Sequence, residues 1–435
     1  MAHLVLLQTA SLRQYMQIAC DVFSLPQWKY FVTVLLGMLK CDETRTLSGI
    51  LRQVAVQRTV SGLSRFLQQA PWSIEALTNQ RQKHFNALVA PEVVQAHADQ
   101  RAQQPRKRGR RRQTVVTGYL ALDDSTCVQA YACKMEGQGW HYSSSDKRSM
   151  PGHSLFQSVY CLLGRQLPLT PQMYRQKTVC EKEGVPFRSK IDMAVQEVET
   201  FVPPADTHTH VLADSWYVAK QVWRAVRQRG WDFTGGLKSN RQLRITLADG
   251  QRLWQRVDHY AAGLTPDDFQ PVLWPSIEGG RWVYGYLVRT RIKKLGACQV
   301  LIVKPEPDAP PGAARYWVTS RLTDSLAQVV AAVAMRWVIE VLFADFKELL
   351  GADHYQVRSA QAIVRFWAIG LFLYQYLDEQ RVSLQRQRGV HVTLGETRTW
   401  VRQQHTDLLL NWIVHQAAQG VSAAHIQDRL RPALL

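Results

Sequence analysis

The stretch 324–351 is largely apolar, and three of its charged residues have a spacing that places them on one side of a helix. The stretch contains no Pro and no internal Gly, and it ends at Gly351, a natural residue for closing a helix. At 100° per residue, Arg336, Glu340 and Lys347 fall within about 40° of one another. Charges on a buried helix persist only when they are paired or hold a metal ion, so this stripe predicts a site.

The remaining residues of 324–351 are mostly Val, Leu, Ile, Phe and Ala, and they point in nearly every direction around the helix axis. A helix that is apolar all round is typical of a buried element. We therefore expect one long helix running through the core. The alternative is a solvated face carrying an ordinary Arg–Glu pair.

The order Arg336, three residues, Glu340, six residues, Lys347 resembles the Y-x(2)-R-x(3)-E-x(6)-K signature of DDE-class insertion-sequence transposases. Val333 stands where that signature has Tyr. The resemblance implies that Glu340 is the third catalytic acid and that the core is ribonuclease H-like. It also implies two catalytic Asp residues upstream, each at the end of a strand.

Two candidate Asp residues occur where the resemblance requires them. Asp124 follows the strand-like VVTGYLALD within a D-S-T triplet, and Asp214 ends the strand-like HVLAD. Parallel sheets present their sites at the carboxyl ends of strands. Asp123 is adjacent to Asp124 and must point to the opposite face of the strand, so only one of the two can be the ligand. We expect Asp124 to be that ligand.

The chemistry of three gathered carboxylates follows from their charge. Such a cluster repels itself unless divalent cations neutralise it, and Mg²⁺ prefers oxygen ligands. Two Mg²⁺ ions, or Mn²⁺ in their place, can activate a water or a 3′-hydroxyl and stabilise the leaving oxygen. The sequence contains no G-x-S-x-G, Walker or H-E-x-x-H motif to indicate another mechanism. We therefore expect Asp124, Asp214 and Glu340 to hold two ions for phosphodiester cleavage.

The composition indicates an acidic partner. The 435 residues carry a formal charge of +18, which for a chain with 46% hydrophobic residues favours nucleic acid over a membrane surface. The seven Cys form no C-x-x-C pair, which argues against a zinc site or a disulfide framework. The start lacks the basic segment of a signal peptide, so we expect a cytoplasmic protein. The resemblance implies that it is bacterial and nucleoid-associated when bound to DNA.

The periodicity predicts an α/β fold with a ribonuclease H-like core, a β-rich insertion, an N-terminal all-α DNA-binding domain and a helical C-terminal tail. Strands are expected at 115–124, 127–135, 153–163, 210–214 and 231–237, with a loop at 137–152 and helices at 190–201 and 216–228. The expected parts are the helical domain 1–100, a basic linker 101–116, the core 117–244, the insertion 245–320, the catalytic-helix part of the core 321–380 and the tail 381–435.

Several basic segments are expected to contact DNA. Two short helices at 46–55 and 59–69 suggest a helix-turn-helix with Arg58 and Arg65 facing DNA, although a plain helical bundle has the same pattern. After strand 231–237, a further group of polar residues is expected to face DNA ends: Lys238, Asn240 and Arg241. The linker forms a basic arm that can follow phosphates, with a solubilising linker as the alternative: Arg106, Lys107, Arg108, Arg110, Arg111 and Arg112.

These features together predict an insertion-sequence transposase that cleaves and transfers DNA strands. In the resembled family, Arg336 and Lys347 contact phosphates near the cleaved end. The expected partner is double-stranded DNA, at element ends and target, with a homodimer assembled on it. The alternatives are another ribonuclease H-like nuclease, a domesticated DNA-binding derivative without catalysis, and a basic protein of membrane surfaces.

Overall fold

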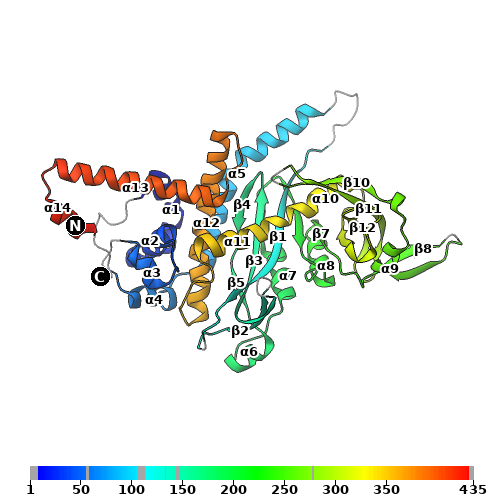
Figure 1. The fold of residues 1–435 in the computed structure, drawn as a ribbon, viewed down its shortest axis with the longest axis horizontal. Coiled ribbons are helices and arrows are strands. Elements are labelled where there is room, and N and C mark those ends of the chain that lie inside the picture. Colours follow the sequence, from blue (N-terminus) through cyan, green and yellow to red (C-terminus); the bar gives the residue numbers. More distant parts are fainter. Residues whose placement is uncertain are drawn as a thin grey trace.

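The computed structural model describes residues 8–54, 58–104, 113–132, 134–143, 147–247, 249–276 and 279–430. Within these ranges, thirteen strands join in one mixed sheet, which runs from the middle of the molecule to the end opposite the N-terminal helices (Figure 1). The strands of its first half are β1 Val116–Val128, β2 Gly139–Ser143, β3 Arg148–Leu162, β4 Arg165–Pro168, β5 Gln172–Tyr174, β6 Thr207–Ala213 and β7 Asp232–Gly236. The expected α/β class is confirmed.

The first half of the sheet is consistent with a ribonuclease H-like core. Its order is β2-β3-β1-β6-β7, with β1 antiparallel to β3 and parallel to β6. Three helices follow β5 or separate β6 from β7: α6 Lys177–Glu183, α7 Lys190–Thr200 and α8 Lys220–Gln228. Parallel neighbours such as β6 and β7 need such a crossover connection.

Two expected boundaries in this region are wrong. The described residues of 127–135 form no separate strand, because Cys127 and Val128 continue β1 and pair with His153 and Gly152 of β3. The expected loop 137–152 instead contains β2 and the beginning of β3. The alternating Trp140, His141 and Tyr142 place aromatic side chains on either face of β2, a pattern that favours a strand.

The second half of the sheet is built from the segment between β7 and the charged helix. Its strands are β8 Gln242–Thr246, β9 Arg252–Arg256, β10 Gln270–Trp274, β11 Arg281–Ile292, β12 Gly296–Lys304 and β13 Arg315–Thr319, and α9 Val257–Ala262 lies among them. Short 3₁₀ turns occupy Pro266–Asp268 and Pro311–Ala313. Strand β13 returns to pair with β7, so these strands extend the core sheet rather than forming a separate one.

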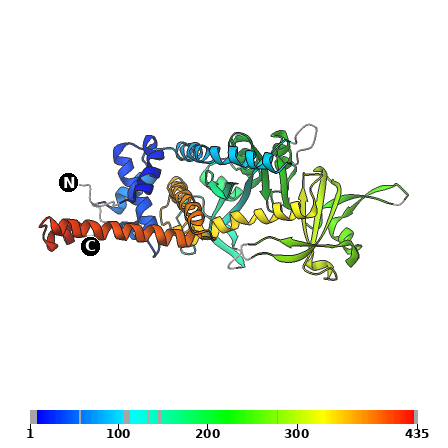
Figure 2. The ribbon, with the colours of Figure 1, turned by 90° about the horizontal axis from the view of Figure 1, so that it is seen from above.

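Helices cover the two faces of the core strands. Leu120 and Leu122 pack with the cluster that includes α7 and α8, whereas Ala121 packs with the cluster that includes the charged helix. Alternate residues of a strand face opposite sides, which accounts for this division. Seen from above, α5 Ile74–Gln103 and the charged helical run lie on opposite sides of the sheet (Figure 2).

The charged stretch forms two helices rather than one. Helix α10 Leu326–Met335 and helix α11 Trp337–Leu350 meet at Arg336, whose N–H bonds the carbonyl of Val333 in a tighter turn. Ser325 caps the start, and Gly351 ends α11 in the left-handed conformation, as expected. The expectation of a helix buried all round is wrong, because one side faces solvent and Trp337 is 60% exposed. By length and composition alone, 326–350 could cross a membrane, but α11 packs on β1.

The N-terminal helices share a hydrophobic core with the C-terminal part of the chain. They comprise α1 Ala10–Met16, a 3₁₀ turn Gln17–Val22, α2 Leu25–Lys40, α3 Leu47–Arg52 and α4 Val60–Gln68. The C-terminal helices are α12 Ala360–Arg388, α13 Leu394–Ala418 and α14 Ala423–Leu430. Helix α12 packs against α2, α4 and α5, and Arg365 on α12 donates to the carbonyls of Leu67 and Trp72. The boundaries expected at 100 and 380 fall inside α5 and α12.

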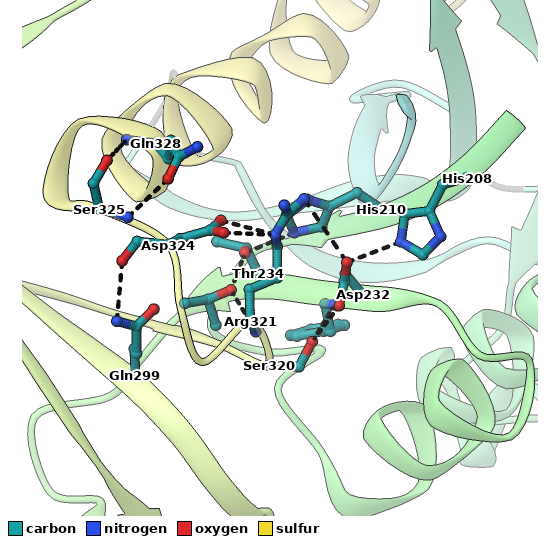
Figure 3. A network of polar contacts seen from close by, with 12 residues as sticks. His208, His210, Asp232, Thr234, Gln299, Ser320, Arg321, Asp324, Ser325 and Gln328 are labelled. Carbon is teal, nitrogen blue, oxygen red and sulfur yellow. Dashed lines mark hydrogen bonds and ion pairs between the residues drawn. The ribbon is translucent and has the colours of Figure 1, made fainter. Parts of the chain in front are cut away.

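A polar network joins the start of α10 to the N-terminal parts of β6 and β7 (Figure 3). His208 Nε2 lies 2.8 Å from Asp232 Oδ2, and His210 Nε2 lies 2.8 Å from Thr234 Oγ1. Arg321 then bridges Asp232 and Asp324, at 3.8 and 2.8 Å, just before the α10 cap. Burial lowers the pKa of His210 to about 4, so this imidazole is neutral at physiological pH. The network therefore orients the helical run that carries Arg336 and Glu340.

A buried carboxyl on α7 makes the stability of the core depend on pH. Glu197 accepts a hydrogen bond from Gln172, and burial raises the pKa of its carboxyl to about 7. The unfolded chain loses this proton near pH 4.5, so folding becomes less favourable as the pH rises towards 7. From pH 5 to pH 8, we expect wild type to lose about 3 kcal/mol more unfolding free energy than Glu197→Gln.

Urea unfolding at the two pH values measures this difference. The control is Glu199→Gln, an exposed position on the same helix, which should follow wild type. Parallel pH dependence of wild type and Glu197→Gln would contradict the assignment.

Candidate active site

The two adjacent Asp residues lie inside β1, at the point where its parallel neighbour stops. Leu122 of β1 pairs with Ala213, the last residue of β6, and β1 then continues beside β3 to Val128. Asp214 therefore follows β6 next to Asp123. The expectation that Asp214 comes directly after a strand is met, whereas Asp124 does not end its strand.

Asp123 faces the helical run α10–α11. Arg336 lies between two acids, with Nη1 3.8 Å from Asp123 Oδ2 and Nη2 2.5 Å from Glu340 Oε1. Burial, and next the negative charge of Asp214, raise the pKa of Asp123 to about 7. This face of β1 thus brings together Asp123, Arg336 and Glu340.

Asp124 faces the opposite side of the sheet, among three donors that sequence reasoning missed. Its carboxylate accepts from Tyr217 Oη at 2.7 Å, from Lys190 Nζ at 2.5 Å and from Ser154 Oγ at 3.1 Å. Burial, and next the charge of Asp124, raise the pKa of Tyr217, so this phenol stays protonated and donates. No sequence pattern indicates this pairing. Tyr217 lies three residues after Asp214, and Lys190 lies at the start of a predicted helix.

The carboxylate of Asp214 stabilises the loop that follows it. Its Oδ1 accepts from the backbone N–H groups of Trp216 at 2.8 Å and Tyr217 at 3.4 Å. Helix α8 starts later, at Lys220 with Ala219 as its N-cap, so Asp214 is not a helix cap. Burial raises the pKa of Asp214, against the lowering effect of these two hydrogen bonds.

Lys347 is attached to the same strand as the Asp pair. Its Nζ donates to the carbonyl oxygen of Thr126 at 2.8 Å. The contact ties the last turns of α11 to β1, two residues beyond Asp124. The expected stripe therefore exists, but its cations are bound to protein groups: Arg336 to two acids and Lys347 to a backbone carbonyl.

Comparison with known protein families decides the affiliation of the chain. Residues 24–253, more than half of the chain, match the family described as DDE superfamily endonuclease, and residues 172–376 match the family described as Transposase DDE domain. The chain belongs to the DDE superfamily. Between them, the two matches span Asp123, Asp124, Asp214 and Glu340. No curated protein matches the chain.

The donor set of this DDE protein suits a hard divalent cation. All candidate ligands are carboxylates, the ligand type that Mg²⁺ and Mn²⁺ favour. Among the described residues, no three His, Cys, Asp or Glu side chains lie close enough together to hold a metal ion. The guanidinium of Arg336 instead supplies positive charge between Asp123 and Glu340. A divalent cation in the place of this guanidinium would neutralise the same carboxylates. The carboxylates therefore fit a divalent metal ion.

A hollow of about 610 Å³ opens beside the acids of the DDE protein. Its lining includes Asp214, Ser215 and Arg336, together with Arg315 and Trp317 of β13. Lys238 and Arg241, expected to face DNA, lie next to it in a second hollow, and Asn240 between them is exposed. The structure therefore brings these residues near the loop of Asp214.

The other expected DNA contacts lie elsewhere. Arg58, just before α4, places its guanidinium 5.2 Å from the ring centre of Tyr30, and Arg65 on α4 is exposed. Their helix packs on α12 rather than on the core strands. The basic arm lies outside the described residues: Arg106, Lys107, Arg108, Arg110, Arg111 and Arg112.

Proposed function

We propose that this DDE protein is an insertion-sequence transposase that cleaves and transfers DNA strands with divalent metal ions. The observation that carries the proposal is that Arg336 lies between Asp123 and Glu340, with Asp214 beside Asp123 at the end of the parallel strand. We also propose that two Mg²⁺ or Mn²⁺ ions serve the site. The partner is double-stranded DNA, on which the protein assembles as a homodimer in the bacterial cytoplasm.

The geometry favours Asp123 over Asp124 as the first acid. Asp123 shares a face with Glu340, while Asp124 is committed to Tyr217 and Lys190 on the other face. Asp123, Asp214 and Glu340 would hold the metal ions, which activate the attacking water or 3′-hydroxyl and stabilise the leaving oxygen. The D-S-T context of Asp124, which resembles that of the family, instead favours Asp124 in the sequence.

The protein's own groups then position the DNA. With Glu340 holding a metal ion, the guanidinium of Arg336 would be available to donate two parallel hydrogen bonds to non-bridging phosphate oxygens. Lys347 keeps α11 in register with β1 through Thr126. The hollow beside Asp214 and Arg336 is where a phosphate of the cleaved strand would lie.

The test is strand cleavage of a linear duplex carrying the inverted repeats that flank the gene. We expect cuts at the repeat ends with Mg²⁺ or Mn²⁺, and none with EDTA. A duplex with scrambled ends is the control. Equal cutting of both duplexes would indicate a nuclease of another specificity, and metal-independent cutting would contradict the proposed chemistry.

We propose that the basic arm and the N-terminal helices hold the DNA outside the active site. Replacing the six arm residues by Gln should weaken binding to all sequences equally. The slope of log affinity against log salt should fall in magnitude by about 0.9 for each lost phosphate contact.

Fluorescence anisotropy between 50 and 300 mM salt measures that slope. Lys177→Gln with Lys182→Gln, exposed positions on α6, provides a control for loss of charge alone. A slope that stays at the wild-type value in the arm variant would mean that the arm is only a linker.

A further inference from the structure

A second hollow lies beside the loop that follows Asp214. Its volume is about 400 Å³, within the range of ligand pockets and too small for a double helix. Ser215 and Trp216 from the loop line it, as does Leu237 after β7. Asp214 thus directly precedes the residues that line a hollow of the size that a small ligand fills. We call this hollow the basic pocket.

The basic pocket is lined by four cations and by no acid: Lys220, Lys238, Arg241 and Lys294. In the described part of the chain, none of the four side chains forms an ion pair with an acid, and the ammonium of Lys238 lies 4.9 Å from the ring centre of Trp216. Burial lowers the pKa of Arg241. Like charges gathered without a counter-charge repel one another, so the pocket favours an anion.

The backbone adds to the positive potential. Helix α8 begins at the pocket with Lys220 and runs for nine residues, and the N-cap Ala219 offers no side chain to its free N–H groups. No acidic residue lies in its first turn. A lysine at the positive end of a helix is unfavourable alone and becomes favourable when an anion binds there.

An aromatic ring stands at the edge of the basic pocket. Trp216 is 59% exposed, although it is a large apolar side chain two residues after Asp214. Exposed aromatic rings beside cations are how proteins bind unpaired nucleic acid, since every base can stack on them. Duplex DNA keeps its bases inside, so this ring suits a single strand.

We propose that the basic pocket binds one nucleotide of an unpaired DNA strand, with its phosphodiester among Lys220, Lys238, Arg241 and Lys294 and its base on Trp216. The inference rests on the proposed function, because it places that nucleotide beside the strand being cut. The pocket holds the strand after the duplex has opened, and the acids act on the neighbouring phosphate.

The test compares binding of a blunt duplex with binding of the same duplex carrying a single-stranded overhang, in EDTA, by fluorescence anisotropy. Trp216→Ala should weaken binding of the overhang DNA about tenfold and leave the blunt duplex unchanged. Trp216→Phe should retain most of the affinity, because a ring is still present. Without metal no cleavage occurs, so the result is independent of whether the proposed chemistry is correct.

The cations are tested by Lys220→Gln with Lys294→Gln. This pair should lower the salt slope for the overhang DNA by about 0.7 per lost contact. The matched control is Arg224→Gln with Lys293→Gln, which removes the same charge from exposed neighbours outside the pocket. An equal loss in the control pair, or an equal loss for blunt and overhang DNA, would overturn the proposal.

Discussion

Replacing Glu340 by Gln should reduce metal-dependent strand cleavage by at least about 10³-fold while leaving the affinity for duplex DNA within twofold of wild type. Glu340 is the only acid that α11 directs at Arg336 among the described ion pairs, and it shares that arginine with Asp123. The amide keeps the size of the side chain but loses the charge that a divalent cation requires. Single-turnover cleavage of a labelled duplex, beside anisotropy in EDTA, measures both quantities.

The matched control for Glu340→Gln is Glu348→Gln, an exposed acid two turns further along α11. It should cleave at the wild-type rate. A thermal melt of both variants shows whether the loss of the Arg336 contact has unfolded the helix. Cleavage by a folded Glu340→Gln at the wild-type rate would remove Glu340 from the mechanism.

Asp123→Asn should abolish cleavage, whereas Asp124→Asn should leave measurable cleavage in a less stable protein. The reason is the face of β1 that each residue occupies: Asp123 faces Arg336, and Asp124 accepts from Tyr217, Lys190 and Ser154. Loss of the Asp124 charge leaves Lys190 without its partner, which should lower the unfolding free energy by about 1–3 kcal/mol.

The comparison is decided by cleavage rate and urea unfolding on the same preparations. Tyr217→Phe removes one donor to Asp124 and should resemble Asp124→Asn in stability while cleaving near the wild-type rate. If Asp124→Asn is inactive at full stability and Asp123→Asn is active, the original preference for Asp124 is right.

Sequence reasoning succeeded where local signals are strong. The strand before Asp214, the helix 190–201 and the left-handed end at Gly351 follow from periodicity and capping chemistry, and the structure contains all three. The charged stripe was found because Arg336, Glu340 and Lys347 repeat at helical spacing in an apolar run. These signals depend only on neighbours in the chain.

The remaining features depend on tertiary pairing. Strand β1 extends past Asp124 because β3 continues beside it. No local sequence pattern in 124–128 predicts this pairing with β3. The same register decides which Asp faces α11. Likewise, the donors around Asp124 and the cations of the basic pocket come from segments far apart in sequence, such as Lys220 and Lys294 in the pocket, and only the fold places them together.

The core shared by the N-terminal helices and α12 has a consequence for synthesis of the protein. Leu35, Phe66 and Leu77 are buried in one cluster with Phe366 and Phe372 of α12, so their partners are made almost 300 residues later. At about 5–20 residues per second, the ribosome needs roughly 15–60 s to supply them. During that time the surfaces of α2 and α4 that pack against α12 have no cover. Nascent chains should therefore depend on a chaperone, and a fragment that ends before α12 should aggregate.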